Sequence, residues 1–301
     1  MSGHHHHHHV NGKNLFITII LNLFITIAQI VGGILSGSLA LLSDALHNFS
    51  DVLALVLAYF AHKLAHKDAD HTKTLGYKRA EIMAAFFNTS LLMLIAIYLI
   101  YEACIKLIHP VNVDSLTIIW LGILSIFLNA LSVLLVKNDA NHNLNMKAAY
   151  LHLLTDMVTS VAVVFGGLLI YYFNIVWVDP LLSILIALYL IGVSWKLLRN
   201  TLFILMQFAP DEIDLQNIVQ KVKTFSSLIQ DMHHVHLWQL DEHHFHLEAH
   251  LSFSQNITLQ ESDAIIDQLE TYFKEEFGIT HTTFQCEFDR CSSKNSLCTV
   301  G

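Results

Sequence analysis

Charged residues are scarce in this chain of 301 residues. They make up 14% of the sequence, against about 25% in average proteins, while hydrophobic residues reach 54%. Proline and glycine are also few, with 3 and 12 residues, which excludes a linker-rich or low-complexity protein. The net charge of −9 excludes nucleic acid as a partner, because that binding needs a basic surface. Together with a mean hydropathy of +0.51, this composition indicates a membrane protein.

The few charges are unevenly divided along the chain. Residues 1–200 carry 11 basic and 10 acidic side chains, whereas residues 201–301 carry 5 basic and 15 acidic ones. The apolar pattern stops near Pro210. We therefore predict four parts, which are a histidine-rich segment at 1–13, a membrane domain at 14–200, an acidic, water-soluble domain at 209–290 and a tail at 291–301. The run His4–His9 is either an affinity tag or a metal-scavenging tail.

Six apolar stretches precede the acidic part, and each is close to the length of about 20 residues that crosses a bilayer. Ten basic residues fall in the loops on one side of the predicted membrane and only one falls on the other. By the positive-inside rule, both termini and the acidic domain lie in the cytoplasm. The predicted spans are 14–35, 38–62, 80–106, 115–136, 147–172 and 177–199.

The second and fifth predicted spans carry the same pair of ionisable residues. His47 and Asp51 form one His-x-x-x-Asp motif, and His152 and Asp156 form another. Residues four apart share one helical face, and ionisable side chains inside a bilayer are costly enough to mark functional sites. With a rise of about 1.5 Å per residue, the two pairs occupy overlapping depths. If the two helices face each other, two imidazoles and two carboxylates converge near the middle of the membrane.

This set of side chains suits zinc, which takes four nitrogen and oxygen ligands in a tetrahedron. The charges cancel, because two neutral imidazoles, two carboxylates and one Zn²⁺ sum to zero. Without metal, two bare carboxylates would repel each other, so protons should bind the same atoms. A site that exchanges metal for protons is half of an antiporter.

Other interpretations of the two pairs stay open. They could be interhelical hydrogen bonds that hold a bundle together. They could also bind metal in a membrane-embedded metalloenzyme, or in a metal sensor without vectorial transport. The sequence contains no His-Glu-x-x-His, and four protein ligands leave no open position for a reactive water. We therefore favour binding and release over catalysis and predict that the protein is not an enzyme.

The sequence resembles the cation diffusion facilitator family over about residues 11–290. Residues 39–51 (LALLSDALHNFSD) are similar to the helix 2 signature of that family, and residues 76–81 (GYKRAE) resemble the start of its helix 3. The resemblance implies a homodimer in a lipid bilayer that exports divalent transition metal with protons as counter-ion. A histidine on helix 2 is associated in the family with zinc over cadmium. The transport ligands fall on His47, Asp51, His152 and Asp156.

From these observations we expect proton-coupled efflux of Zn²⁺ from the cytoplasm by alternating access, with other divalent transition metals as further substrates. Zinc would enter a site open to the cytoplasm and displace protons, and it would leave after the helices open outward. We also expect zinc in the cytoplasmic domain as a structural or regulatory ion that strengthens the dimer.

The acidic domain is predicted to contain a helix (211–225), two strands (231–240 and 243–254), a second helix (258–277) and a third strand (279–289). The order αββαβ is typical of a small ferredoxin-like α+β layer, as in the cytoplasmic domain of the family. Histidines are unusually dense in its strands. Matched to the family strand by strand, the cytoplasmic metal ligands fall on His233, His250, His281 and Glu287.

Two acidic residues near helix ends lead to narrower expectations. Asp44 lies seven residues before Asp51 and nearly on the same helical face. It is either an exit-side relay for metal or protons or, as we expect, a solvated residue of an outer cavity. Glu81, near the start of the third span, most simply complements the dipole of that helix.

The loop after the second span is a further candidate metal site. Asp70 matches an aspartate ligand of some family members, but Lys73 and Tyr77 stand where their histidines are. His66 and His71 could substitute, although a solvated loop facing lipid headgroups is the simpler interpretation.

Overall fold

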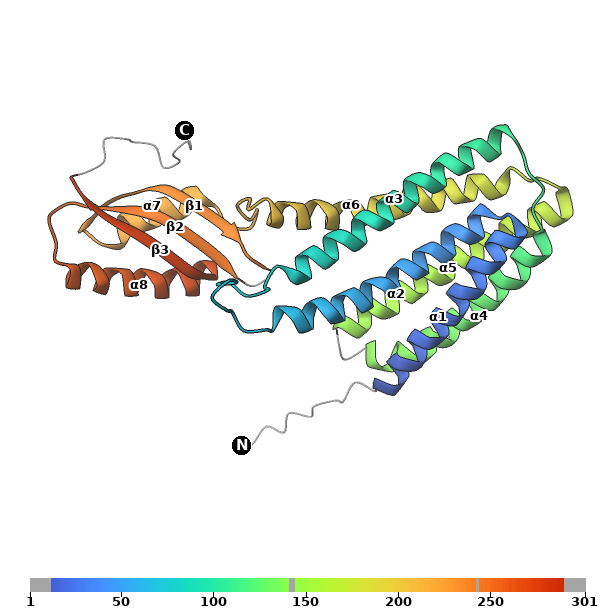
Figure 1. Cartoon of the computed structure of the whole chain (residues 1–301), viewed down its shortest axis with the longest axis horizontal. Helices are drawn as coiled ribbons and strands as arrows, with labels where there is room; N and C mark the ends of the chain where they lie inside the picture. The colour runs from blue at the N-terminus through green and yellow to red at the C-terminus, as the bar shows by residue number, and fades with distance from the viewer. Residues whose placement is uncertain (1–11, 141–143, 242–243, 290–301) are drawn as a thin grey trace. The chain divides into compact units, whose positions relative to one another are not determined.

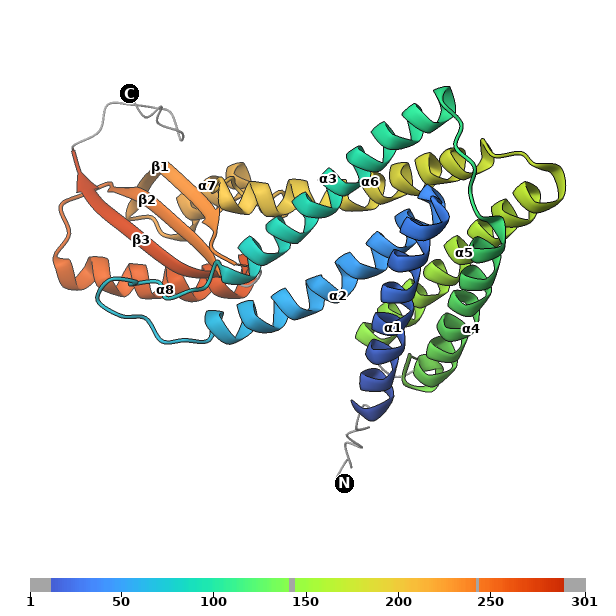
Figure 2. The same cartoon turned by 45° about the vertical axis from the view of Figure 1, so that its right-hand side comes forward.

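The computed structural model describes residues 12–140, 144–241 and 244–289. Six long helices come first and a small α+β domain follows (Figures 1 and 2). The predicted segments His4–His9 and 291–301 lie outside the described residues. The six long helices are α1 (Gly12–Ser36), α2 (Leu39–Ala65), α3 (Ala80–Ile108), α4 (Ser115–Ala140), α5 (Leu144–Phe173) and α6 (Val178–Leu205). The α+β domain consists of α7 (Leu215–Phe225), β1 (Ile229–Gln239), β2 (Phe245–Phe253), α8 (Leu259–Phe277) and β3 (Ile279–Phe288).

The six long helices are each long and apolar enough to cross a membrane. Large apolar side chains cover their outer surfaces, and Leu35, Phe87 and Trp120 are each more than half exposed. Such a surface would be unfavourable in water but suits contact with lipid. The six predicted spans are therefore confirmed, and the chain is a multi-pass membrane protein. Helix α6 continues to Leu205, six residues beyond its predicted end.

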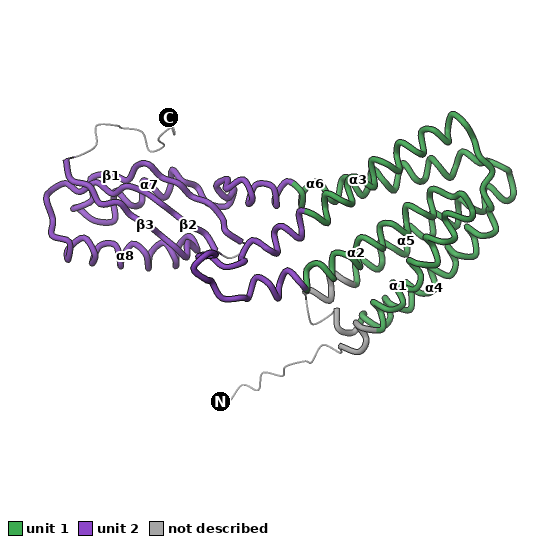
Figure 3. Tube along the Cα trace, viewed as in Figure 1, with its two compact units in different colours: residues 1–59, 87–198 green, residues 60–86, 199–301 purple. Residues whose placement is uncertain are grey.

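The described part of the chain forms two compact units (Figure 3). The first lies within residues 1–59 and 87–198 and holds most of the long helices. The second lies within residues 60–86 and 199–301, so it contains the α+β domain together with the loop between α2 and α3 and the adjoining helix ends.

Within the first unit, the backbones of α1 and α2 lie close together near the turn that connects them. The two helices are separated by a short turn in which Gly37 has φ +70°, a conformation that favours glycine. A Cβ atom on Gly33 would lie 3.1 Å from the backbone nitrogen of Leu42. Glycine is therefore favoured there, because a side chain would push the two backbones apart by a few tenths of an ångström. The buried core of this unit includes Ala40, Leu41, Leu99, Ile118, Val163, Ala187 and Leu190.

The α+β domain is a three-stranded mixed sheet in the order β1-β2-β3. Strands β1 and β2 are antiparallel, and β2 and β3 are parallel. Both helices contribute to the apolar core under one face of the sheet, whose buried members include Ile218, Val222, Met232, Leu247, Leu251, Leu269 and Phe273. Because side chains alternate along a strand, the histidines of β2 fall on the opposite face. The predicted order αββαβ is confirmed.

Capping residues set the helix ends in this domain. The carboxylate of Asp214 accepts from the backbone N–H of Gln216 at 2.9 Å, so α7 begins four residues later than predicted. Helix α8 begins with a capping box formed by Thr258 and Glu261, and it ends at Gly278, where φ is +68°.

Candidate metal centre

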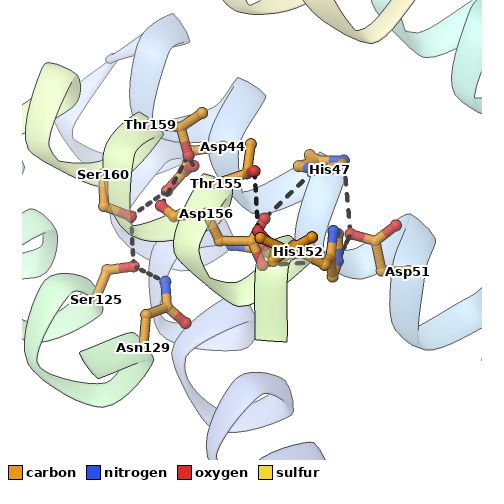
Figure 4. Close-up of polar contacts among 12 residues, drawn as sticks. Asp44, His47, Asp51, Ser125, Asn129, His152, Thr155, Asp156, Thr159 and Ser160 are labelled. Atoms are coloured by element: carbon orange, nitrogen blue, oxygen red, sulfur yellow. Dashed lines mark hydrogen bonds and ion pairs between the residues drawn. The ribbon is translucent and has the colours of Figure 1, made fainter. Parts of the chain in front are cut away.

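Four ionisable side chains from α2 and α5 converge in the first compact unit (Figure 4). On one side of the site, Asp51 Oδ2 lies 3.6 Å from His47 Nδ1 and 3.1 Å from His152 Nε2. On the other side, Asp156 Oδ1 lies 3.6 Å from His47 Nε2, and Asp156 Oδ2 lies 3.7 Å from His152 Nε2. The structure thus brings together all four residues of the two His-x-x-x-Asp motifs, which we call the α2–α5 quartet.

The quartet is buried on one side and accessible on the other. The side chain of Asp156 is fully buried, whereas those of Asp51 and His152 are 27% and 40% exposed. Among the described residues, His47 Nδ1, Asp51 Oδ2 and both carboxylate oxygens of Asp156 are buried without a hydrogen-bond partner. Buried polar atoms normally form hydrogen bonds, so this group of atoms without them is well suited to binding a cation. One ligand atom from each of His47, His152 and Asp156 lies within 4.8 Å of the other two.

The start of α6 holds the start of α2 in place. The carboxylate of Asp179 accepts from the backbone N–H groups of Leu39 and Ala40, at 2.8 and 3.2 Å, and from the hydroxyl of Ser38. These N–H groups have no partner inside α2, because they belong to its first turn. Sequence reasoning missed this role of Asp179, since its partners lie about 140 residues away in the chain.

The expectation of a solvated Asp44 was wrong, because its side chain is buried and only 1% of the residue is exposed. Its carboxylate accepts from Gln29 Nε2 and Thr159 Oγ1, both at 2.7 Å, and from Ser160 Oγ at 3.2 Å. Ser160 also contacts Ser125 Oγ at 2.9 Å (Figure 4). The physical reason is that α1 and α5 cover this face of α2 and supply polar donors to the carboxylate.

A second cluster lies in the α+β domain, on the face of the sheet opposite its apolar core, and the side chains of His233 and Glu287 are buried there. His250 Nδ1 is 3.0 Å from Glu287 Oε1, and His233 Nε2 is 3.4 Å from Glu287 Oε2. Gln285 Nε2 donates to Glu287 Oε1 at 2.7 Å. Burial lowers the pKa of His250 from its ordinary value, although the carboxylate of Glu287 opposes that shift. His233, His250 and Glu287 offer ligand atoms within 4.8 Å of one another.

His281 does not join this second cluster, which corrects the predicted set of cytoplasmic ligands. Its ring lies beside that of His246, with centroids 4.7 Å apart, and the two residues are register partners on β2 and β3. Six residues of extended strand separate His281 from Glu287, a distance of about 20 Å. Matching the sequence to the family strand by strand does not show the register between β2 and β3, so it could not separate His281 from the other three residues.

The loop aspartate Asp70 is used in a turn. Its carboxylate accepts from the hydroxyl and backbone N–H of Thr72 and from the backbone N–H of Lys73, and the ammonium of Lys73 lies 3.3 Å away. These hydrogen bonds, above all that from the Thr72 hydroxyl, lower the pKa of Asp70 to about 2. A metal ion at Asp70 would therefore have to displace the ammonium of Lys73.

Comparisons with known proteins agree with the two parts of the chain. The family model described as the cation efflux transmembrane domain matches residues 15–206, and the model described as the cytoplasmic domain of cation efflux proteins matches residues 210–289. The chain is 35% identical over 297 residues to the "Cadmium, cobalt and zinc/H(+)-K(+) antiporter" of Bacillus subtilis (strain 168), which covers 98% of this chain and 95% of the relative. It is 32% identical to the "Metal cation efflux system protein CzcD" of Cupriavidus metallidurans, with 98% and 93% covered. It is 31% identical to the "Zinc transporter ZitB" of Yersinia pestis, with 94% and 90% covered.

Proposed function

The chain belongs to the cation efflux, or cation diffusion facilitator, family, and from that premise we propose that it exports Zn²⁺ from the cytoplasm in exchange for protons. The family consists of metal cation transporters and not of enzymes. The observation that carries the proposal is the convergence of the two His-x-x-x-Asp pairs, in which His47, Asp51 and Asp156 each have a buried ligand atom without a hydrogen bond to the described residues.

The α2–α5 quartet offers two imidazoles and two carboxylates, a donor set that zinc accepts in tetrahedral geometry. The relatives from Bacillus subtilis and Yersinia pestis both have zinc in their names, and the first also has cadmium and cobalt. Ligand type alone separates these metals poorly. Competition among zinc, cadmium, cobalt and manganese in a transport assay is therefore the measurement that sets selectivity.

Protons compete with zinc because both bind the same imidazole and carboxylate atoms. In an inward-open state, Zn²⁺ displaces protons from the quartet, and in an outward-open state protons displace Zn²⁺. Exchange of two protons for one Zn²⁺ is electroneutral and gains about 2.7 kcal/mol per unit of pH gradient. Exchange of one proton for one Zn²⁺ would move one net charge across the membrane. The membrane potential changes the free energy of that step by about 2.3 kcal/mol per 100 mV.

The test is zinc flux in proteoliposomes that contain the purified full chain. An imposed pH gradient should drive zinc across the bilayer, and collapse of the gradient with a protonophore should stop it. A K⁺ gradient is a second arm, because the name of the Bacillus subtilis relative includes K⁺. Zinc binding without gradient-driven flux would favour a metal sensor or a membrane metalloenzyme and would overturn the proposal.

We further propose a homodimer with both termini and the α+β domain in the cytoplasm. The match to the cytoplasmic domain of cation efflux proteins and the bias of basic residues in the loops support this arrangement. In this arrangement, His233, His250 and Glu287 bind a regulatory zinc ion that strengthens the dimer.

The regulatory ion is tested by substitution of a histidine in the cluster on the sheet. His250→Ala should weaken zinc binding to the α+β domain, because it removes a ligand 3.0 Å from Glu287. His281→Ala is the matched control, since His281 lies on the same sheet but beside His246. Equal zinc binding by both variants would reject the assignment.

A further inference from the structure

Two histidines and a glutamate form a third cluster, outside the α2–α5 quartet and the cluster on the sheet. His62 lies in the last turn of α2, His66 directly follows that helix, and Glu81 is the second residue of α3. One ligand atom from each lies within 4.8 Å of the other two. All three residues belong to the second compact unit. Their side chains are accessible, with those of His62 and Glu81 exposed by 66% and 42%.

The contacts of this cluster orient its imidazoles. His66 Nδ1 lies 2.9 Å from the backbone carbonyl oxygen of His62, and a carbonyl oxygen can only accept. Nδ1 therefore carries the hydrogen in the neutral ring, which leaves the lone pair on Nε2. A hydrogen bond from the remote ring nitrogen to a carbonyl is the usual outer contact of a metal-bound histidine. The rings of His62 and His66 have centroids 4.2 Å apart, and one ring nitrogen of each lies within 4.8 Å of the other and of a carboxylate oxygen of Glu81.

Glu81 faces the two imidazoles, so its role is wider than complementing the dipole of α3. Its Oε1 atom lies 2.7 Å from His62 Nδ1. Two imidazoles and one carboxylate form a common zinc ligand set in which the fourth position is left to water. Tetrahedral ligand atoms are about 3.4 Å apart, so modest rotations of these exposed side chains bring them to bonding distance.

We propose that His62, His66 and Glu81 bind a divalent transition metal ion of the zinc class, as a separate site at the junction of α2 and α3. In the nearby loop, the carboxylate of Asp70 is already engaged by Thr72 and Lys73. A site with three protein ligands, an open position and an exposed surface exchanges its metal readily, unlike a closed structural site.

The experiment is an equilibrium zinc titration of the purified full chain, with Zn²⁺ alone as the ligand. The double variant His62→Ala/His66→Ala should bind one zinc ion fewer per chain than the unmodified protein. His71→Ala, which removes another exposed histidine of the same loop, should lose none. The run His4–His9 is common to every variant, so its zinc cancels in the difference. Glu81→Gln keeps the shape of the side chain and should raise the dissociation constant of this site at least about tenfold, because loss of even an outer contact commonly costs that much.

An unchanged stoichiometry in the double variant would overturn the site, as would an equal loss in His71→Ala. Melting temperature and zinc binding, measured together, separate a metal site from a hydrogen bond between the two helices. A bond between His62 and Glu81 that serves only folding would lower the melting temperature of the variants and leave zinc binding unchanged, and that result would also overturn the site. Because the titration needs no gradient, it succeeds or fails independently of zinc flux.

Discussion

Asp51→Asn should weaken zinc binding at the α2–α5 quartet by about two orders of magnitude. Asparagine has nearly the same shape as aspartate, so the change removes a charge and leaves the packing of α2 intact. With zinc bound, the quartet and the metal are neutral, whereas the variant keeps one uncompensated positive charge. Neutralising one partner of a buried ion pair costs about 3–5 kcal/mol. At 1.4 kcal/mol per factor of ten, that is a rise of about 10²- to 10⁴-fold in the dissociation constant.

The exposure of each carboxylate ranks the expected effects. Asp51 is 27% exposed, so water partly compensates the lost charge and the effect falls near the lower end of the range. Asp156 is fully buried and faces both imidazoles, so Asp156→Asn should fall near the upper end. Asp68→Asn makes the same charge change at an exposed position in the loop after α2 and should leave zinc affinity at the quartet unchanged.

The assay is zinc binding to the purified chain by calorimetry, followed by pH-driven zinc flux in proteoliposomes. Flux at low zinc concentration should fall in parallel with affinity. Near-normal affinity in Asp51→Asn would refute the argument from charge balance. An Asp156→Asn variant that binds zinc better than Asp51→Asn would refute the ranking by burial.

Three further predictions concern the framework around the sites. Gly33→Ala should lower the melting temperature of the full chain, because its Cβ would meet the backbone of Leu42 at 3.1 Å. Gly192→Ala should not, because no atom of the described residues lies within 4 Å of the added Cβ. Asp179→Ala leaves the first N–H groups of α2 and Ser38 without their acceptor, so it should cost about 1–3 kcal/mol and lower the melting temperature as well as zinc affinity. Thr258→Ala removes the capping box of α8 and should cost about 1 kcal/mol, measured as faster amide hydrogen exchange in that helix; unchanged exchange would contradict the role of the cap.

The sequence predicted well the features that depend only on a short stretch of chain. Hydropathy located all six spans, because a membrane helix must satisfy its own backbone and remain apolar throughout. The quartet followed from two copies of a motif whose spacing already places His47 with Asp51 and His152 with Asp156 on single helical faces.

The features that sequence missed depend on segments that meet across long separations. Asp44 is buried by donors from α1 and α5, so its position in α2 alone suggested a solvated residue. The cap that Asp179 supplies to α2 has no local pattern. His281 was misassigned because strand register decides which residues of β3 meet His250. The cluster with Glu81 arises where the end of α2 meets the start of α3; the sequence offered His66 as a candidate ligand in this loop but did not show that His62 and Glu81 lie beside it.

The contacts between α2 and α5 connect the chemistry of the site to movement of the helices. Asp44 in α2 accepts from Thr159 in α5, His152 in α5 contacts Asp51, and His47 in α2 contacts Asp156. Each of these contacts includes a carboxylate, and two of them include an imidazole that zinc would bind. If the proposed function holds, exchange of Zn²⁺ for protons changes the charge of the groups that form two of these three contacts. A change in occupancy therefore alters the free energy of the α2–α5 interface directly, so coupling requires no relay through distant residues.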